Sequence, residues 1–257
     1  IMKLKFLFFF LGLIFSLNAS VAGNPSYHSE SLNYKVMFKW GLVHKQAGRA
    51  TVNITDHGNK YVATLTARSE SWADKFYSVR DTLISTMSKS DFLPERYERI
   101  AYEGGTFAHD IVTISRSGTT FTGDTERYRR KKNKINTVKS TGTLKAEGHT
   151  VDLLSVFYYL RAINFETLTP GYTKTINIFS GKKKELINIK YLKKEVLEVD
   201  NKKFETYKIS FTFTTDGETK SSDDIFTWIS TDSNHIPLKL EGKLKVGKIL
   251  CIYTGGN

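Results

Sequence analysis

The sequence is poor in the residues that hold small or metal-dependent folds together. Cys251 is the only cysteine among 257 residues, so no disulfide can form within the chain. The six histidines are scattered, and none belongs to an HxH or HExxH motif, the spacings typical of metal sites. We therefore expect neither a disulfide nor a metal, and a chain of this length can bury a core without them.

Signatures of catalysis and of membrane-spanning helices are also missing. There is no G-x-S-x-G motif, which marks the nucleophile of many serine hydrolases. Cys251 lies in the apolar segment KILCIY, where burial raises a thiol pKa and makes the group inert. The apolar run at residues 6–17 is shorter than the roughly 20 residues that cross a bilayer. The sequence thus predicts no catalytic residue, no cofactor and no transmembrane span.

The N-terminus has the order of a secretory signal. Two lysines precede the apolar run, and Ser-Val-Ala at residues 20–22 supplies the small side chains of a cleavage site. We expect residues 1–22 to be a signal peptide and residues 23–257 to form a single β domain. The protein is then exported, to the periplasm or the periplasmic face of a bacterial envelope.

The chain is strongly basic. Removal of Lys3 and Lys5 lowers the basic count from 38 to 36, against 26 acidic residues, which leaves a net charge of +10. Such a charge favours anionic partners, and for an exported protein these are lipid head groups or acidic glycans rather than nucleic acid. Two basic runs, at residues 126–134 and 181–185, fall where hairpin turns are expected. The candidate residues for docking on an anionic surface are Arg127, Arg129, Arg130, Lys131 and Lys132. The alternative is that both runs are solvated loop tips with no partner.

Alternation of apolar and polar residues predicts β-strands along most of the chain. In residues 34–42 every even position is apolar, the pattern of a half-buried strand. About a dozen such segments follow one another with turn residues between them. Residues 71–79 are less regular and predict a short helical corner. No strand–helix alternation occurs, which disfavours a parallel α/β fold, so the fold class is all-β with antiparallel pairing.

One segment, Val151–Asn164, predicts a helix with an unusually wide apolar surface. At 3.6 residues per turn its apolar side chains form two adjacent stripes, and only Asp152, Ser155 and Tyr159 make a narrow polar edge. Asp152 is placed to cap the first turn. Because a flat sheet covers one face only, we expect a curled antiparallel sheet, an open or half barrel, to wrap around this buried helix.

Two interpretations of the helix remain open. It either plugs the barrel and completes a dry core, or part of its surface lines a cavity for a lipid-like ligand. The candidate ligand-binding residues in the second case are Trp40, Leu154, Phe157, Tyr158 and Arg161. Arg161 then faces an anionic head group, or alternatively only stabilises the negative end of the helix.

Four stretches, taken in order, resemble the DUF3108 family of exported bacterial proteins. They are FKWGLVHKQAGRATV, SVRDTLIST, VDLLSVFYYLRAINFETLTPG and WISTDSNHIPLKLEGKLKVGKI. The richness in Lys, Asn and Ile is similar to that of members from Bacteroidetes. The chain is more distantly similar to the half-open barrels of the LolA/LolB lipoprotein carriers, which hold acyl chains against a helical lid. The resemblance implies an envelope location and a curved antiparallel sheet, and it brings no established catalytic or binding residues.

Three functions follow as hypotheses. The first is a non-catalytic envelope protein that binds or carries an apolar or amphipathic molecule. The second is a structural or partner-docking module with a dry core, and the third is a hydrolase. A continuous cavity of roughly 300 Å³ or more beside the helix favours the first over the second.

The signal peptide gives a direct prediction. If residues 1–22 are removed on export, protein isolated from the envelope fraction begins near Gly23. N-terminal sequencing checks this, and envelope protein that still begins at Met2 would contradict it.

Overall fold

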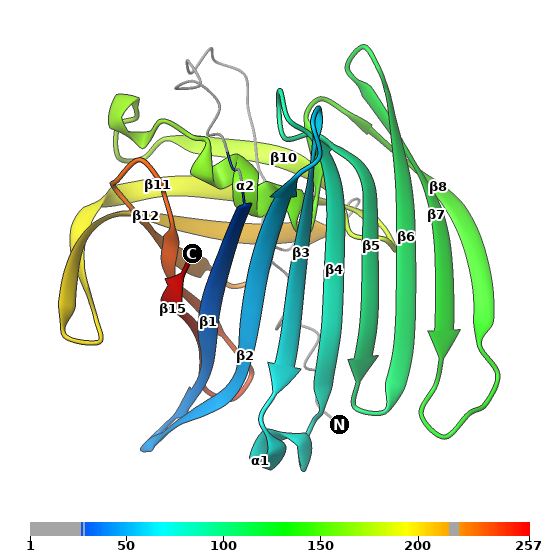
Figure 1. Ribbon diagram of the computed structural model, residues 1–257, viewed down its shortest axis with the longest axis horizontal. Coiled ribbons are helices and arrows are strands. Elements are labelled where there is room, and N and C mark those ends of the chain that lie inside the picture. Colours follow the sequence, from blue (N-terminus) through cyan, green and yellow to red (C-terminus); the bar gives the residue numbers. More distant parts are fainter. Residues whose placement is uncertain (1–26, 28, 216–220) are drawn as a thin grey trace.

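The computed structural model describes Tyr27, residues 29–215 and residues 221–257. In this part of the chain a single 15-stranded sheet makes up almost the whole structure (Figure 1). The predicted signal peptide lies outside the described residues.

The elements follow one another along the chain with short connections. The strands are β1 (Ser29–Trp40), β2 (Val43–Asp56), β3 (Lys60–Ser69), β4 (Val79–Ser88), β5 (Pro94–Glu103), β6 (Thr106–Ser117), β7 (Thr120–Arg130), β8 (Val138–Glu147), β9 (Thr150–Asp152), β10 (Thr173–Phe179), β11 (Lys184–Val199), β12 (Lys202–Thr215), β13 (Ile225–Ser230), β14 (Pro237–Lys243) and β15 (Lys248–Gly256). The helices are α1 (Ser71–Asp74), α2 (Ser155–Arg161) and the 3-10 turn η1 (Phe165–Thr167).

The sheet consists of two meanders, which are joined where the first strand pairs with the last. Its spatial order runs from β8 back to β1, then from β15 back to β9. The first and last strands pair antiparallel, with Val36 opposite Cys251, and this pairing joins the two halves. All neighbours pair antiparallel except β9 and β10, which are parallel because α2 and η1 separate them in the chain. The predicted all-β fold built from hairpins is confirmed.

The two halves also meet at their free edges. The Asn177 side chain on β10 donates to the carbonyl of Glu147 at 2.7 Å, and its backbone N–H donates to the carbonyl of His149. Gly123 on β7 lies so near Phe179 that a Cβ there would be 2.8 Å from the ring. Strands β10–β12 therefore cross β1–β8 at a steep angle and cover them (Figure 1). The barrel-like sheet is nearly closed, more so than the open or half barrel we expected.

Strand alternation supplies the core. On β4 every second position, from Val79 to Met87, is almost completely buried, and the positions that alternate with them, such as Thr82 and Ile84, are partly exposed. The same period of two places Leu32, Tyr34 and Val36 of β1 inside. This is the pattern of a sheet with one face packed and one face solvated.

Helix α2 is buried, as predicted, but it is shorter than the predicted range of 151–164. Residues 150–152 pair with β10 as strand β9 instead, so the helix begins at Ser155 and ends at Arg161. The expected polar edge is not solvated: Asp152 and Ser155 are completely buried, and Tyr159 alone is partly exposed. A short helix, α1, confirms the predicted corner after Ser71. No helix in the described part of the chain is long and apolar enough to cross a membrane.

Arg161 fixes the end of α2 inside the barrel. Its side chain is 1% exposed, and its guanidinium makes a two-pronged pair with Glu30 of β1, at 2.6 and 2.7 Å. It also donates to the carbonyl of Asn234, before β14. The guanidinium lies 4.7 Å from the centre of the Tyr27 ring. One side chain thus joins the helix to both halves of the sheet.

We expect Arg161→Ala to lower the free energy of unfolding by about 3–5 kcal/mol, because it leaves the partly buried Glu30 carboxylate without its partner. The control is Arg116→Ala, which removes a half-exposed pair with Asp91 and should change stability little. Chemical denaturation of the purified proteins measures both. Equal, small losses for the two variants would show that the Arg161 pair does not hold the fold.

Candidate functional site

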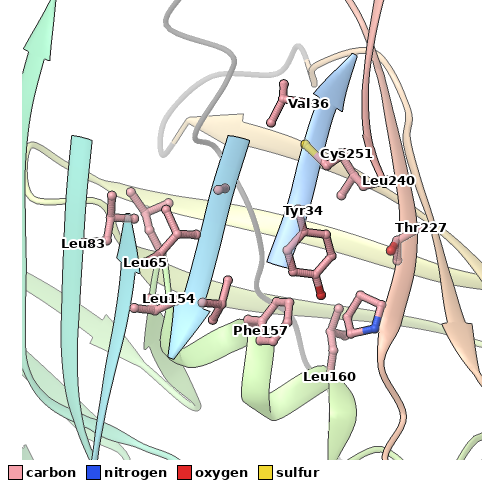
Figure 2. Close-up of a pocket in the computed structure, with 14 residues that line it drawn as sticks. Tyr34, Val36, Leu65, Leu83, Leu154, Phe157, Leu160, Thr227, Leu240 and Cys251 are labelled. Atoms are coloured by element: carbon pink, nitrogen blue, oxygen red, sulfur yellow. The ribbon is translucent and has the colours of Figure 1, made fainter. Parts of the chain in front are cut away.

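The best candidate site is an apolar cavity of about 90 Å³ between α2 and the sheet. Figure 2 shows Phe157 and Leu160 of α2, with Leu154 just before the helix, on one side, and side chains of β1, β3, β4, β13, β14 and β15 around the rest. The lining residues are Tyr34, Val36, Ala50, Val52, Leu65, Leu83, Leu153, Leu154, Phe157, Leu160, Thr227, Pro237, Leu240 and Cys251. They are almost all apolar, so the cavity suits an apolar group and offers little to water.

Asp152 holds the beginning of α2 against this cavity. Its Oδ1 accepts from the backbone N–H groups of Leu154 and Ser155, at 2.7 and 2.8 Å, and its Oδ2 accepts from Ser85 Oγ at 2.5 Å. The predicted capping role of Asp152 is therefore visible, although the residue itself lies in β9. Complete burial raises the pKa of Asp152 to about 6, and the hydrogen bonds from Ser85 and the helix start offset part of that rise.

The cavity contains one polar atom that the protein does not satisfy. Tyr34 is 8% exposed, and its hydroxyl has no hydrogen-bond partner among the described residues. In Figure 2 this oxygen points toward α2, beside Phe157. Burial raises the pKa of Tyr34, so the hydroxyl stays protonated and is a donor. Leaving such a group unpaired costs roughly 1–3 kcal/mol, so it requires an explanation.

The structure brings together two of the five predicted ligand-binding residues. Leu154 and Phe157 line the cavity. Tyr158 is fully buried but faces Tyr27, with ring centres 5.2 Å apart, and does not line it. Arg161 is bound to Glu30 rather than facing the cavity.

Trp40 lies away from the cavity. It has the inward phase of β1, as the alternation predicted, but it stands at the end of the strand, beyond the covered part of the sheet, and is 58% exposed. Sequence reasoning missed Tyr34, although it lies in the same alternating stretch. The period of two identifies the inward face and does not show where along the strand the cavity lies.

The predicted basic cluster does not form one loop patch. Arg127, Arg129 and Arg130 belong to strand β7. Arg127 Nε pairs with the buried Asp110 at 2.9 Å, and Arg129 pairs with the same carboxylate. Arg130 packs over the ring of Phe107. The turn residues Lys131 and Lys132 are exposed and free to meet a partner, so only part of the cluster resembles the predicted docking surface.

A second buried polar group, which the sequence analysis did not identify, lies on the inner face of β4 and β5. Arg99 Nη2 donates to Asp81 at 3.0 Å and to Glu103 at 2.8 Å. Burial, together with the neighbouring Glu103, raises the pKa of Asp81 against the opposing charge of Arg99. The signal was present, because the alternation of β4 puts Asp81 in phase with Val79 and Leu83. Both carboxylates share one guanidinium, an arrangement typical of a structural ion cluster.

Neither the described histidines nor the cysteine forms a recognisable reactive group. Within the described ranges, no cluster of three or more His, Cys, Asp or Glu side chains is placed to hold a metal ion. Burial raises the pKa of the Cys251 thiol to about 12, which keeps it protonated and makes it a poor nucleophile.

Comparisons with known proteins agree with the fold. The model of the family described as "Protein of unknown function (DUF3108)" matches residues 33–251. A search of curated proteins gave no match. The chain is similar to the crystal structure of a beta-barrel-like protein of the domain of unknown function DUF1849 from Brucella abortus. The TM-score is 0.58 at 10% identity, over 90% of this chain and 97% of that one, a likeness that concerns the fold alone. The similarity to LolA/LolB carriers and to Bacteroidetes members stays a prediction.

The buried Asp152 gives a pH prediction. Folded protein keeps this carboxyl protonated up to a pH of about 6, whereas the unfolded chain loses the proton near 3.8. The free energy of unfolding therefore falls as the pH rises from about 4 to 6. The decrease is up to about 3 kcal/mol if the pKa of Asp152 differs between the folded and unfolded states by the whole of this amount.

In the Asp152→Asn variant the free energy of unfolding should not show this decrease between about pH 4 and 6. Its amide still accepts from the helix start and can donate to Ser85, so the cap is preserved. Denaturation of both proteins at several pH values between 4 and 7 measures the difference. Parallel stability curves would show that Asp152 does not titrate as its burial implies.

Proposed function

The chain belongs to the DUF3108 family, and we propose that it is a non-catalytic binding protein whose cavity beside α2 receives the apolar part of an amphipathic molecule. A polar atom of that molecule accepts a hydrogen bond from Tyr34. The protein acts in this proposal as an exported envelope protein, as its predicted signal peptide implies.

The unpaired Tyr34 hydroxyl is the observation that carries the proposal. The residue opposite Tyr34 on β2 is Ala50, whose small side chain leaves space instead of filling the cavity. A dry core needs no polar atom at this position, and phenylalanine would fill it at lower cost. A donor inside an apolar cavity is what a site for a mostly apolar ligand with one acceptor requires.

The size of the cavity limits the ligand. About 90 Å³ is well below the roughly 300 Å³ of most ligand sites, and an engineered cavity of about 150 Å³ takes one benzene. A whole lipid does not fit in this volume. A slender apolar group fits, such as one end of an acyl chain, and the rest of the molecule then lies outside the cavity.

The same small volume favours a second candidate, a docking module with a dry core. In that case the cavity is a packing defect and the functional surface is outside. The two candidates differ in what Tyr34 does, because a packing defect has no ligand to retain.

The test compares Tyr34→Phe with Tyr97→Phe. Tyr97 is also fully buried with an unpaired hydroxyl, but it does not line the cavity. Both variants should be stabilised when empty, by about 1 kcal/mol, because each loses an unsatisfied buried donor. Tyr34→Phe alone should lower the amount of co-purified amphipathic molecule, by up to about tenfold for one hydrogen bond.

Native mass spectrometry and mass spectrometry of organic extracts measure the bound molecules. Ala50→Leu provides a second variant, which fills the cavity and leaves Tyr34 in place, and it should also abolish retention. If wild-type protein carries no such molecule, or if Tyr97→Phe loses as much as Tyr34→Phe, the docking module is the better account.

A further inference from the structure

The end of the barrel away from α2 carries a group of exposed apolar side chains. Leu42 is fully exposed, Trp40 is 58% exposed and Phe76 is 83% exposed. Monomeric proteins seldom leave large apolar side chains clustered in water, and such patches mark interaction sites. We call this group, together with Val43 and Val246, the apolar tip.

Contacts between three connections hold the apolar tip together. Trp40 and Val43 are opposite each other in the β1–β2 hairpin. The β14–β15 turn packs on this hairpin, since a Cβ on Gly247 would be 2.9 Å from the Trp40 Cβ and 2.3 Å from the Lys39 carbonyl. Glycine is therefore required there, also because its φ is +75°.

Helix α1 adds the third part of the tip. The Trp72 indole N–H donates to the carbonyl of Gln46 on β2 at 2.6 Å, and the Phe76 ring packs edge-on against Trp72. Figure 1 shows α1 and the β1–β2 hairpin at the same end of the molecule. The apolar tip is thus a fixed surface built from three connections.

The tip has two acidic neighbours, Glu70 and Asp74 beside and in α1, and each pairs with an arginine, Arg49 and Arg80. The charges that remain unpaired among the described residues around the tip are positive. Lys39, Lys45, Lys75 and Lys245 are exposed, and none of them makes an ion pair with a described residue. The flanking segments 31–55 and 242–257 contain no Asp or Glu. A surface that opposes this tip must therefore supply negative charge.

We propose that the apolar tip docks on an anionic lipid bilayer, with Leu42 and Trp40 entering the head-group region and the lysines contacting lipid phosphates. Tryptophan prefers this interface, and lysines beside inserted apolar side chains strengthen attachment to anionic leaflets. A protein partner fits less well, because lysine is depleted in the cores of protein interfaces. The proposal does not depend on a ligand in the cavity.

The inward face of β1 connects this surface to the cavity. Tyr34 and Val36 line the cavity, Phe38 follows at the next inward position, and Trp40 ends the series at the tip. A docked protein consequently has one continuous apolar strand face between the bilayer and the cavity.

The experiment measures sedimentation of the full-length protein with phosphatidylcholine vesicles, with and without phosphatidylglycerol. Wild type should bind only the anionic vesicles, and salt near 1 M should weaken binding by screening. Lys39→Gln, Lys45→Gln and Lys245→Gln together should weaken binding by roughly fivefold for each lysine. Leu42→Ser with Val43→Ser should weaken it at least about tenfold.

The controls use the β7–β8 turn, which also combines apolar and basic side chains. Ile135→Ser removes a side chain that is 93% exposed, and Lys131→Gln with Lys132→Gln removes two exposed charges of the predicted cluster. These variants should bind like wild type, and all should melt at the wild-type temperature. Residues 1–26 are common to every protein compared, so their contribution cancels.

Three outcomes would overturn the proposal. The first is that wild-type protein does not bind anionic vesicles. The second is that the tip variants bind these vesicles as well as the turn variants do, or better. Light scattering that shows self-association of wild type, lost in Leu42→Ser, would assign the apolar tip to a second copy of the chain.

Discussion

The buried pair between Arg161 and Glu30 is the interaction on which the rest of the structure depends. A helix of seven residues is too short to be stable alone, so tertiary contacts must hold it. The Arg161 guanidinium ties it to β1 and to the loop before β14, while Asp152 ties its beginning to β4 through Ser85. With both ends fixed, Leu154, Phe157 and Leu160 face the sheet, and their positions define the cavity.

The positive charge of the protein is divided between two uses. Arg99, Arg127 and Arg129 neutralise buried or nearly buried carboxylates on the inner face of the sheet. The charges of these guanidinium groups are neutralised within the fold, so they contribute little to the positive potential at the protein surface. The lysines beside the apolar tip make no ion pair with a described residue, so in our proposal they favour contact with an anionic surface. This division explains why net charge alone did not point to the surface that we propose for docking.

Much of the fold was predictable because strand alternation has a short period that a local sequence shows directly. The pattern at Tyr34, Val36 and Phe38 was sufficient to identify β1 and its inward face. The start of the helix was less predictable, because Val151 and Asp152 are compatible with both a helix and a strand. Pairing with β10 makes them part of strand β9. Leu154 and Phe157 were found as site residues, since a wide apolar helix surface must meet something apolar.

The sequence by itself determined the all-β class, the antiparallel hairpins, the presence of one buried helix and the inert surroundings of Cys251, because each depends on the order of neighbouring residues. Only the tertiary structure decided that Arg161 binds Glu30, which is 131 residues away, and that Trp40 extends past the covered sheet. It also decided that the cavity is small and that the Tyr34 hydroxyl finds no hydrogen-bond partner among the described residues. Those features depend on how distant strands curve toward one another, and side-chain contacts across a barrel leave no local pattern in the chain.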